Sequence, residues 1–381
     1  MLFHSRTKNS GVVNCYLYNQ LDYETAKKIK DLKMNKINVA VIGLGHAAND
    51  FHLPVLTQFD DVELFLCDSW PERLTESKEK WEIPEERCFN DIEKMMESVN
   101  INASYVLFPQ YIWRGRPPTP HQEVVKSVLA YGKPVFVEKP LSMTYPDAKE
   151  LADAAAEAGV NTTQVGYQRR FNPLLTEGLK LVRERGPLLN CSFGFFKGLK
   201  PYDPEVDVIP IPPYDHLTLD FIHCLDLMRW VPQSEMTDFF STTGRVGVEP
   251  ELTQFHAMGK FKNGCTSVFS SNMRAGARVL DFQLHGIGIS VYITMAPGGS
   301  HYSSMKATIL RDNDPENPKY IYDYELAPDG RSQGCVGFWQ ENRHFIDCVT
   351  SDVSTQCEFS DAAKTSELAD IILNKIPEKT T

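Results

Sequence analysis

The chain contains the stretch Ile37-Asn38-Val39-Ala40-Val41-Ile42-Gly43-Leu44-Gly45-His46-Ala47-Ala48, in which an apolar run leads into two glycines. The run predicts a buried strand over 37–42, because it is short and rich in β-branched residues. The residues after the glycines predict a helix over 47–59 that is interrupted near Pro54. A strand, a tight glycine turn and a helix in this order predict the start of a nucleotide-binding α/β domain.

Each small residue of the turn suits a bound pyrophosphate for a physical reason. Gly43 permits the tight turn, and Gly45 lets the backbone approach the phosphates without a Cβ in the way. The small side chain of Ala48 lets the helix pack close to the sheet, and the free N–H groups at the helix start favour anions. We therefore expect the turn, including His46 and Ala47, to contact a dinucleotide cofactor.

The pattern of strand and helix continues to about residue 165. Alternating strands and helices with short connections predict a parallel, doubly wound sheet, the α/β class. The further strands are expected at 62–67, 104–108 and 134–137, and helices at 121–132 and 146–158. We expect an extension over 1–33 to precede this nucleotide-binding domain of residues 34–165.

The pattern of predicted strands and helices changes in the second half, residues 166–381. The sequence Lys262-Asn263-Gly264 between two β-like runs predicts a type I′ hairpin turn. We expect an α+β domain with a large, mainly antiparallel sheet that binds substrate and mediates oligomers. Its strands are expected at 190–197, 237–247, 252–261, 265–274, 279–294 and 319–326, and its helices at 172–185, 216–231, 338–350 and 361–374.

Composition restricts the function classes. The 381 residues carry a formal net charge of −11, which argues against a nucleic-acid partner because such a partner needs a basic face. No apolar run approaches the ~20 residues that span a bilayer, and residues 1–20 lack the apolar centre of a signal peptide. Nine scattered cysteines without a C-x-x-C pair predict reduced thiols and a cytoplasmic location.

Asp68 lies just past the second strand, twenty residues beyond Ala48. A carboxylate there accepts hydrogen bonds from the adenosine ribose and repels a 2′-phosphate, so NAD is favoured over NADP. A helix N-cap is the alternative role, because the residues after Asp68 suit a helix start. Arg73 is a candidate phosphate ligand.

Lys139 ends the run Val135-Phe136-Val137-Glu138-Lys139-Pro140. A lysine at the carboxyl end of a central strand in such a sheet faces the ligand crevice. The proline biases the lysine toward extended backbone and admits a cis peptide bond. Although lysines are mostly exposed surface amines, this position favours a functional one.

The helix over 216–231 is apolar almost all round, and its polar exceptions share one face. His216, Asp220 and His223 lie at i, i+4 and i+7. Polar groups on a buried helix are costly unless they are paired or line a cavity. A zinc site and a core histidine are the alternatives to a catalytic face, and we expect no metal. Asp226 is expected to pair with Arg229.

In these motifs the chain resembles the glucose–fructose oxidoreductase/inositol dehydrogenase (Gfo/Idh/MocA) family, over about residues 36 to 375. The resemblance implies oxidation or reduction of a hydroxyl or keto carbon on a sugar, sugar phosphate or cyclitol by NAD(P). It also implies a homodimer or homotetramer. The motifs are Gly43–Ala48, Cys67-Asp68 with Pro71-Glu72-Arg73, Glu138-Lys139-Pro140, Gly166-Tyr167-Gln168-Arg169-Arg170-Phe171-Asn172-Pro173 and His223-Cys224-Leu225-Asp226.

The resemblance implies roles for individual residues. Lys139 matches the lysine that hydrogen-bonds the reacting oxygen, and His223 matches the general acid/base. Many members carry an aspartate four residues before this histidine, where this chain has Leu219, so Asp220, three before, takes that role instead. The expected substrate contacts are Lys139, Tyr167, Arg170, Lys197, Asp220 and His223. The expected cofactor contacts beyond the glycine turn are Asp68, Arg73, Pro109, His121, Glu138 and Lys139.

Two other functions remain open from the sequence. An enzyme that recycles tightly held NAD for glycoside hydrolysis or dehydration would use the same site. A cofactor-sensing regulator would have kept the fold and lost the chemistry, which the retained Lys139 and His223 argue against. The loop over 110–120 is a candidate wall of the site, and the loop over 200–215 a candidate lid.

Overall fold

Six parallel strands form the first sheet of the computed structural model, which describes residues 36–108, 121–198, 215–246, 251–295, 305–327 and 335–374. The sheet order is β3-β2-β1-β4-β5-β6, so the predicted doubly wound sheet is confirmed. Its strands are β1 (Ile37–Ile42), β2 (Val62–Cys67), β3 (Cys88–Phe89), β4 (Ala103–Val106), β5 (Val135–Val137) and β6 (Thr163–Val165). The expected extension over 1–33 and the loops expected at 110–120 and 200–214 lie outside the described residues.

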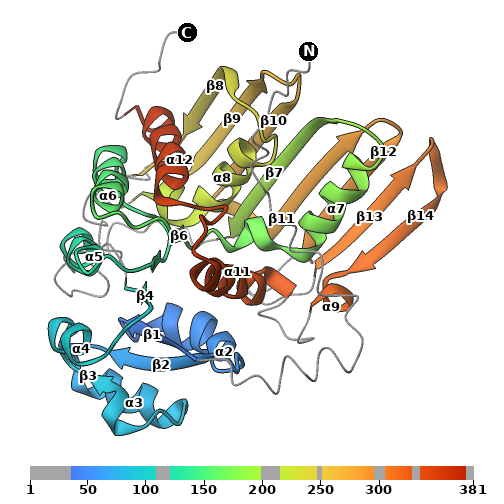
Figure 1. The fold of residues 1–381 in the computed structure, drawn as a ribbon. Helices are drawn as coiled ribbons and strands as arrows, with labels where there is room; N and C mark the ends of the chain where they lie inside the picture. Colours follow the sequence, from blue (N-terminus) through green and yellow to red (C-terminus); the bar gives the residue numbers. More distant parts are fainter. Residues whose placement is uncertain are drawn as a thin grey trace, which may run out of the picture. The chain divides into compact units, whose positions relative to one another are not determined.

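Helices alternate with these strands, as the sequence predicts (Figure 1). The first helix is irregular near Pro54, as expected: it is π-helical over η2 (Ala48–His52) and α-helical over α2 (Leu53–Leu56). Pro54 has no N–H to donate to the carbonyl of Asn49, and Lys80 Nζ donates to that carbonyl at 3.2 Å instead. The other helices are α3 (Pro71–Lys80), α4 (Ile92–Ser98), α5 (His121–Leu129) and α6 (Tyr145–Glu157).

Eight strands form a second sheet in the order β14-β13-β12-β11-β7-β10-β9-β8. β7 and β10 pair in parallel and the other neighbours are antiparallel, so the expected mainly antiparallel sheet is confirmed. Its strands are β7 (Leu188–Gly198), β8 (Met236–Gly244), β9 (Gln254–Phe261), β10 (Thr266–Asn272), β11 (Arg274–Gly286), β12 (Ile289–Met295), β13 (Met305–Arg311) and β14 (Asp314–Tyr322).

Three details of this sheet differ from the sequence prediction. The run over 279–294 is two strands, because the chain turns at Gly288 with φ +64 while the apolar alternation continues on both sides. β13 was not predicted, and α9 (Asp323–Leu326) replaces the last residues of the strand expected at 319–326.

The turn between β9 and β10 also differs from the predicted type I′ turn. Gly264 is left-handed with φ +86, whereas Asn263 is not among the residues with positive φ. The N–H of Gly264 donates to the carbonyl of Phe261 at 2.8 Å, and Phe261 N–H to the carbonyl of Cys265 at 2.9 Å. This is a three-residue loop in which one glycine follows a type I turn.

Helices cover one face of the second sheet (Figure 1): α7 (Pro173–Arg183), η5 (Leu217–Phe221) and α8 (Ile222–Trp230).

Other positions on the strands of this sheet are exposed, and three apolar side chains form a row across neighbouring strands. Phe240, Met258 and Val268 are 65%, 51% and 40% exposed, and the strand register places Met258 opposite both of the others. The homodimer or homotetramer expected from the sequence stays a prediction, which the molecular mass in solution tests.

The end of the chain packs back onto the first half. In α11 (Phe338–Ser351), Phe338 and Phe345 share one apolar cluster with Val39 and Tyr105 of the first sheet. α12 (Phe359–Ile372) lies beside α6. The described residues from Ile37 onward therefore form a single unit, and the expected boundary near residue 165 stays a prediction.

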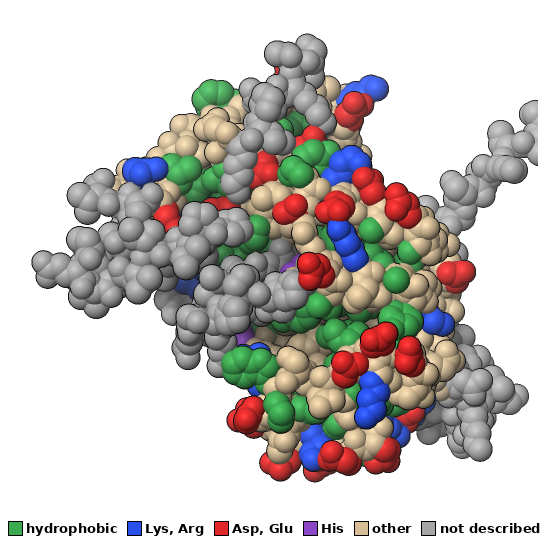
Figure 2. Space-filling model, turned by 90° about the vertical axis from the view of Figure 1, so that its left-hand side faces the viewer, with side chains coloured by type: hydrophobic (Ala, Val, Ile, Leu, Met, Phe, Trp, Pro, Cys, Tyr) green, Lys and Arg blue, Asp and Glu red, His purple; other side chains and the backbone are tan. Residues whose placement is uncertain are grey.

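The surface seen in Figure 2 carries carboxylates and amines interspersed, with no contiguous basic field on that face. In the part of the chain that the structure describes, each helix is too short or too polar to cross a bilayer.

Candidate functional site

The glycine turn after β1 has the shape that the sequence predicts. Gly43 has φ +90, and a Cβ there would lie 2.8 Å from Phe108 Cδ1, so the position requires glycine. A Cβ on Gly45 would meet no atom within 4 Å, so this position faces open space. The helix begins at the next residue and Ala48 is fully buried against the sheet. An open glycine at a helix N-terminus fits a nucleotide pyrophosphate.

Asp68, the residue after β2, is hydrogen-bonded to this turn. Its Oδ2 accepts from Leu44 N–H at 2.8 Å and its Oδ1 from Trp70 N–H at 2.9 Å, and the residue is 7% exposed. The alternative role as an N-cap is wrong, since Trp70 occupies the N-cap of α3 and no side chain caps it. Each carboxylate oxygen keeps one lone pair for a ribose hydroxyl, so the expected cofactor role stays open.

Asn49 is a residue of this turn that the sequence reasoning missed. Its Nδ2 donates to the carbonyl of Leu44 at 2.9 Å, and its Oδ1 accepts from Trp81 Nε1 at 2.8 Å. Together with Asp68 it therefore holds both the N–H and the carbonyl of Leu44. No local pattern distinguishes Asn49, because its partner Trp81, just after α3, is far along the chain.

The other predicted cofactor contacts take different positions. His46 is exposed and pairs with Asp50 at 2.5 Å, and Ala47 is half-buried beside it. The guanidinium of Arg73 lies over the Trp70 ring, with Cζ 5.0 Å from the ring centre. His121 is 4% exposed, and burial lowers its pKa to about 4, so it is neutral at pH 7. Pro109 lies outside the described residues.

Lys139 leaves the end of β5 through the turn that the sequence singled out. Its N–H donates to Glu138 Oε2 at 2.9 Å, and the Lys139–Pro140 peptide is cis. Its Nζ donates to the carbonyl of Leu219 at 2.7 Å. Leu219 lies in η5, where π-helical pairing changes which carbonyls are used within the helix. The lysine thus connects the first sheet to the helix that carries Asp220 and His223.

Behind this turn lies a buried relay that the sequence reasoning also missed. His52 is fully buried, with Nε2 3.1 Å from Glu138 Oε1 and Nδ1 3.1 Å from Asn342 Oδ1. Asn342 Nδ2 donates to the carbonyl of Phe338 at 2.7 Å, which directs its oxygen toward His52. With this orientation of Asn342, His52 Nδ1 is the donor to Asn342 Oδ1. Glu138 is thus held by His52 and by the N–H of Lys139, and its expected cofactor contact stays a prediction.

Asp220 sits in a dense charged cluster on the other side of Lys139. It pairs with Lys197 Nζ from the end of β7, and its Oδ2 lies 3.7 Å from His216 Nδ1. His216 Nε2 lies 3.1 Å from Glu251 Oε2. Burial opposes a charge on His216, but the bonds to Asp220 and Glu251 outweigh it and raise its pKa to about 9. Burial likewise opposes a charge on Asp220, yet His216 and Lys197 hold its pKa well below the usual range.

His223 lies one turn further along, in α8, and is 5% exposed. Its ring meets the edge of Tyr167 with centroids 6.1 Å apart. Tyr167 is fully buried, and burial raises the pKa of its hydroxyl well above the usual value. Tyr167 therefore backs the histidine instead of offering a surface to substrate, which differs from the prediction.

Arg170, expected at the substrate, is instead committed to a buried ion network. Its Nε and Nη2 donate to both oxygens of Asp226 at 2.6 and 2.5 Å, and its Nη1 donates to the carbonyl of Gln356 at 2.6 Å. Asp361 lies 2.8 Å from Nη2. The main partner of Asp226 is thus Arg170, whereas Arg229, 3.6 Å away, pairs with Asp361 at 2.7 Å. The side chain of Arg170 is 0% exposed, and each of its three nitrogens is bonded within the protein.

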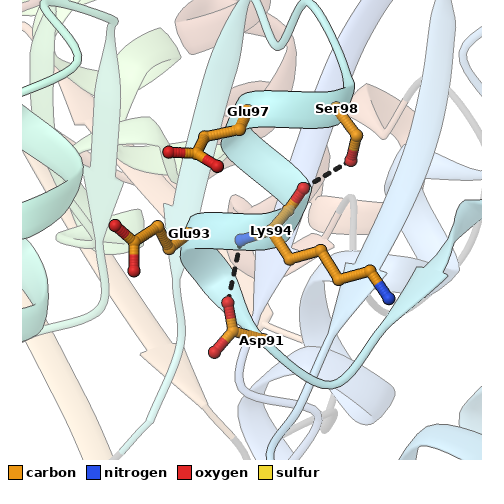
Figure 3. A pocket seen from close by; sticks show the side chains of 5 residues that line it. All are labelled: Asp91, Glu93, Lys94, Glu97 and Ser98. Carbon is orange, nitrogen blue, oxygen red and sulfur yellow. Dashed lines mark hydrogen bonds between the residues drawn. The ribbon is translucent and has the colours of Figure 1, made fainter.

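The surface hollow in Figure 3 is lined by none of the site residues described above. Among the described residues, no group of three His, Cys, Asp or Glu side chains is arranged to hold a metal ion. The hollow has a volume of about 360 Å³ and is lined by one stretch of chain at α4: Asp91, Glu93, Lys94, Glu97 and Ser98. Asp91 there accepts from Lys94 N–H at 2.8 Å, which is a helix cap.

Comparison with known proteins agrees with the fold and the glycine turn. Residues 37–167 match the GFO_IDH_MocA model, described as oxidoreductase family, NAD-binding Rossmann fold. A myo-inositol 2-dehydrogenase of Thermotoga maritima is 27% identical over 246 residues, 63% of this chain and 69% of that protein. An uncharacterized oxidoreductase of Schizosaccharomyces pombe is 33% identical over 123 residues, 32% of this chain, and the match spans only 31% of that protein.

A solved structure extends the likeness to the second sheet. The aldose–aldose oxidoreductase from Caulobacter crescentus has a TM-score of 0.71 at 19% identity, and the match covers 89% of this chain and 97% of that one. At this identity the match speaks for the fold alone. Residues 37–167 thus resemble the Gfo/Idh/MocA family of oxidoreductases, and the likeness in fold to that solved structure extends over most of the chain.

Proposed function

We propose that this protein is an NAD-dependent dehydrogenase or reductase that acts on a secondary hydroxyl or keto carbon of a sugar, sugar phosphate or cyclitol. The observation that carries the proposal is the position of Lys139. It extends from the carboxyl end of β5 to the helix of Asp220 and His223, with Nζ bonded to Leu219 O at 2.7 Å. Ligands of such sheets bind at the carboxyl ends of the strands.

The glycine turn is the part of the chain that would hold the cofactor. Gly43 and Gly45 shape the turn, and the open space at Gly45 suits the pyrophosphate. Asp68, with a free lone pair on each oxygen, supports NAD over NADP because it would repel a 2′-phosphate. The nicotinamide, when bound, accepts or supplies the hydride.

The chain's own groups handle the proton and the developing charge. Lys139 Nζ exchanges its bond to Leu219 O for one to the reacting oxygen and stabilises negative charge there. The imidazole of His223 takes the hydroxyl proton or returns it. Asp220 holds the cations of the cluster in place through Lys197.

The test is Lys139→Met, with absorbance at 340 nm measured over a panel of sugars, sugar phosphates and inositols. We expect kcat to fall by about 10³-fold, the usual effect of removing one charge-stabilising donor, while NAD affinity measured by calorimetry is unchanged. Lys149→Met, which removes an exposed lysine of α6, is the control. Full turnover in Lys139→Met would refute the role of the lysine. Substrate conversion by the unaltered protein without net NADH would instead favour recycled-NAD chemistry.

A further inference from the structure

Arg169 is a buried guanidinium without a partner of its own. It lies in η4 (Gln168–Phe171) and is 7% exposed. Its Nε has no hydrogen-bond partner, and it forms no salt bridge with a carboxylate of the described residues. The guanidinium packs over the Phe195 ring, with Cζ 5.1 Å from the ring centre. A buried charge without a counterion is costly, so this one requires an explanation.

Two further cations converge on the same aromatic ring. Arg278 Cζ lies 4.8 Å from the centre of the Phe195 ring and Lys197 Nζ lies 5.5 Å from it. Burial and then the charge of Arg169 lower the pKa of Arg278 to about 10. Burial lowers the pKa of Lys197 as well, although Asp220 opposes this. Three basic side chains from η4, β7 and β11 are thus packed closely enough to disfavour one another's charge.

Two carboxylates described near these cations already have partners. Asp220 pairs with Lys197, and Glu251 is bonded to His216, which is itself charged at neutral pH. Lys139 adds one more cation, close enough to lower the pKa of both Asp220 and Lys197. Among the described residues, the buried charge of Arg169 therefore has no carboxylate to neutralise it, and a bound anion would do so in this poorly solvated place.

We propose that the substrate is an anionic polyol, a sugar or cyclitol that carries a carboxylate or a phosphate monoester, and that Arg169 with Lys197 and Arg278 binds its charged group. This inference rests on the proposed dehydrogenase function and narrows its substrate class. The planar fork of a guanidinium matches both anions in a bidentate way. Arg170, the next residue, offers the matched contrast, since each of its three nitrogens is bonded within the protein.

The test compares initial rates with NAD for D-glucuronate and D-glucose 6-phosphate against D-glucose and myo-inositol. We expect kcat/KM for one of the anionic substrates to exceed that for the neutral ones about 100-fold, and the preferred anion then distinguishes carboxylate from phosphate. In Arg169→Gln we expect KM for that substrate to rise about 10- to 100-fold, with kcat nearly unchanged, because the charged group binds away from the reacting carbon. Arg185→Gln, which alters an exposed arginine bonded to Asp312, is the control.

Further outcomes separate this inference from the function on which it rests. Equal kcat/KM for neutral and anionic substrates, with no change in Arg169→Gln, overturns the inference and leaves the dehydrogenase function standing. If nothing is oxidised, calorimetry in the presence of NAD decides. Binding of D-glucuronate or inorganic phosphate that Arg169→Gln abolishes supports the anion site without the function. If Arg169→Gln does not fold, Arg169→Lys keeps the charge without the fork and is expected to raise KM for the anionic substrate alone.

Discussion

Two charged clusters lie on either side of a single peptide bond, that between Arg169 and Arg170, and they are built in opposite ways. On the side of Arg170, two arginines face two aspartates: Arg170 binds Asp226, and Arg229 binds Asp361. Thr365 Oγ1 also donates to Asp226 Oδ1 at 2.8 Å. The charges of these two arginines and two aspartates balance, and each nitrogen of Arg170 has a partner. In the cluster around Arg169, with Lys197 and Arg278, the guanidinium of Arg169 has no carboxylate partner among the described residues.

The difference separates structure from function in a way that residue type cannot. A buried ion network whose charges balance and whose donors are used stabilises one arrangement of the chain and has nothing to offer a ligand. A buried cation that no carboxylate neutralises destabilises the ligand-free protein, and binding of an anion removes this cost. We therefore infer that the network around Arg170 holds α8, α12 and η4 together. The cluster around Arg169 is, on our proposal, a surface that binds the substrate anion.

The largest expected effect comes from Arg170→Met. Removing one partner leaves the buried Asp226 carboxylate uncompensated, so the free energy of unfolding should fall by about 3–5 kcal/mol. Urea denaturation measures this, and Arg169→Met is the matched control, with a change within ~1 kcal/mol or a gain. An equal loss of unfolding free energy in the two variants would contradict the distinction between the clusters.

A smaller effect is expected from pH, because only the cluster around Arg169 contains a group that titrates between neutral and mildly alkaline pH. The pKa of His216 is raised to about 9 in the folded chain, above its ordinary value. Its contribution is fully present below pH ~6.5 and is lost as the pH rises through about 9, a change on the order of 2–3 kcal/mol. Denaturation midpoints at pH 7 and pH 10 measure it.

His216→Gln supplies the control for this pH dependence. The variant should be less stable than the unaltered protein at pH 7 and should lose less stability between pH 7 and pH 10. A wild-type protein and a variant with parallel pH profiles would show that His216 does not hold its proton through Asp220 and Glu251.

The smallest effect is expected from an exposed ion pair, which separates the contribution of burial from that of pairing. Lys149 and Asp153 lie four residues apart on α6, 2.5 Å from each other, and both side chains are 55% exposed. Asp153→Asn should change the free energy of unfolding by no more than about 0.5 kcal/mol, because solvent screens the pair. A loss comparable to that of Arg170→Met would mean that pairing rather than burial sets the scale.

The sequence alone determined those features whose causes are local. The run of apolar residues before Gly43, the open position at Gly45 and the lysine at the end of Val135–Val137 all follow from a strand meeting a turn, and the structure confirms each element. The parallel sheet followed by a mainly antiparallel one was likewise readable from the spacing of strands and helices.

Only the tertiary structure decided what neighbouring residues of the same type do. Arg169 and Arg170 are indistinguishable in the sequence, yet the partner of Arg170 lies 56 residues away and that of His52 lies 290 residues away. The π-helical segment at Leu217–Phe221 also turns Leu219 O toward Lys139, which spacing on a regular helix does not foresee. The physical reason is that burial and charge balance belong to the folded surroundings of a side chain, and these are assembled from segments far apart along the chain.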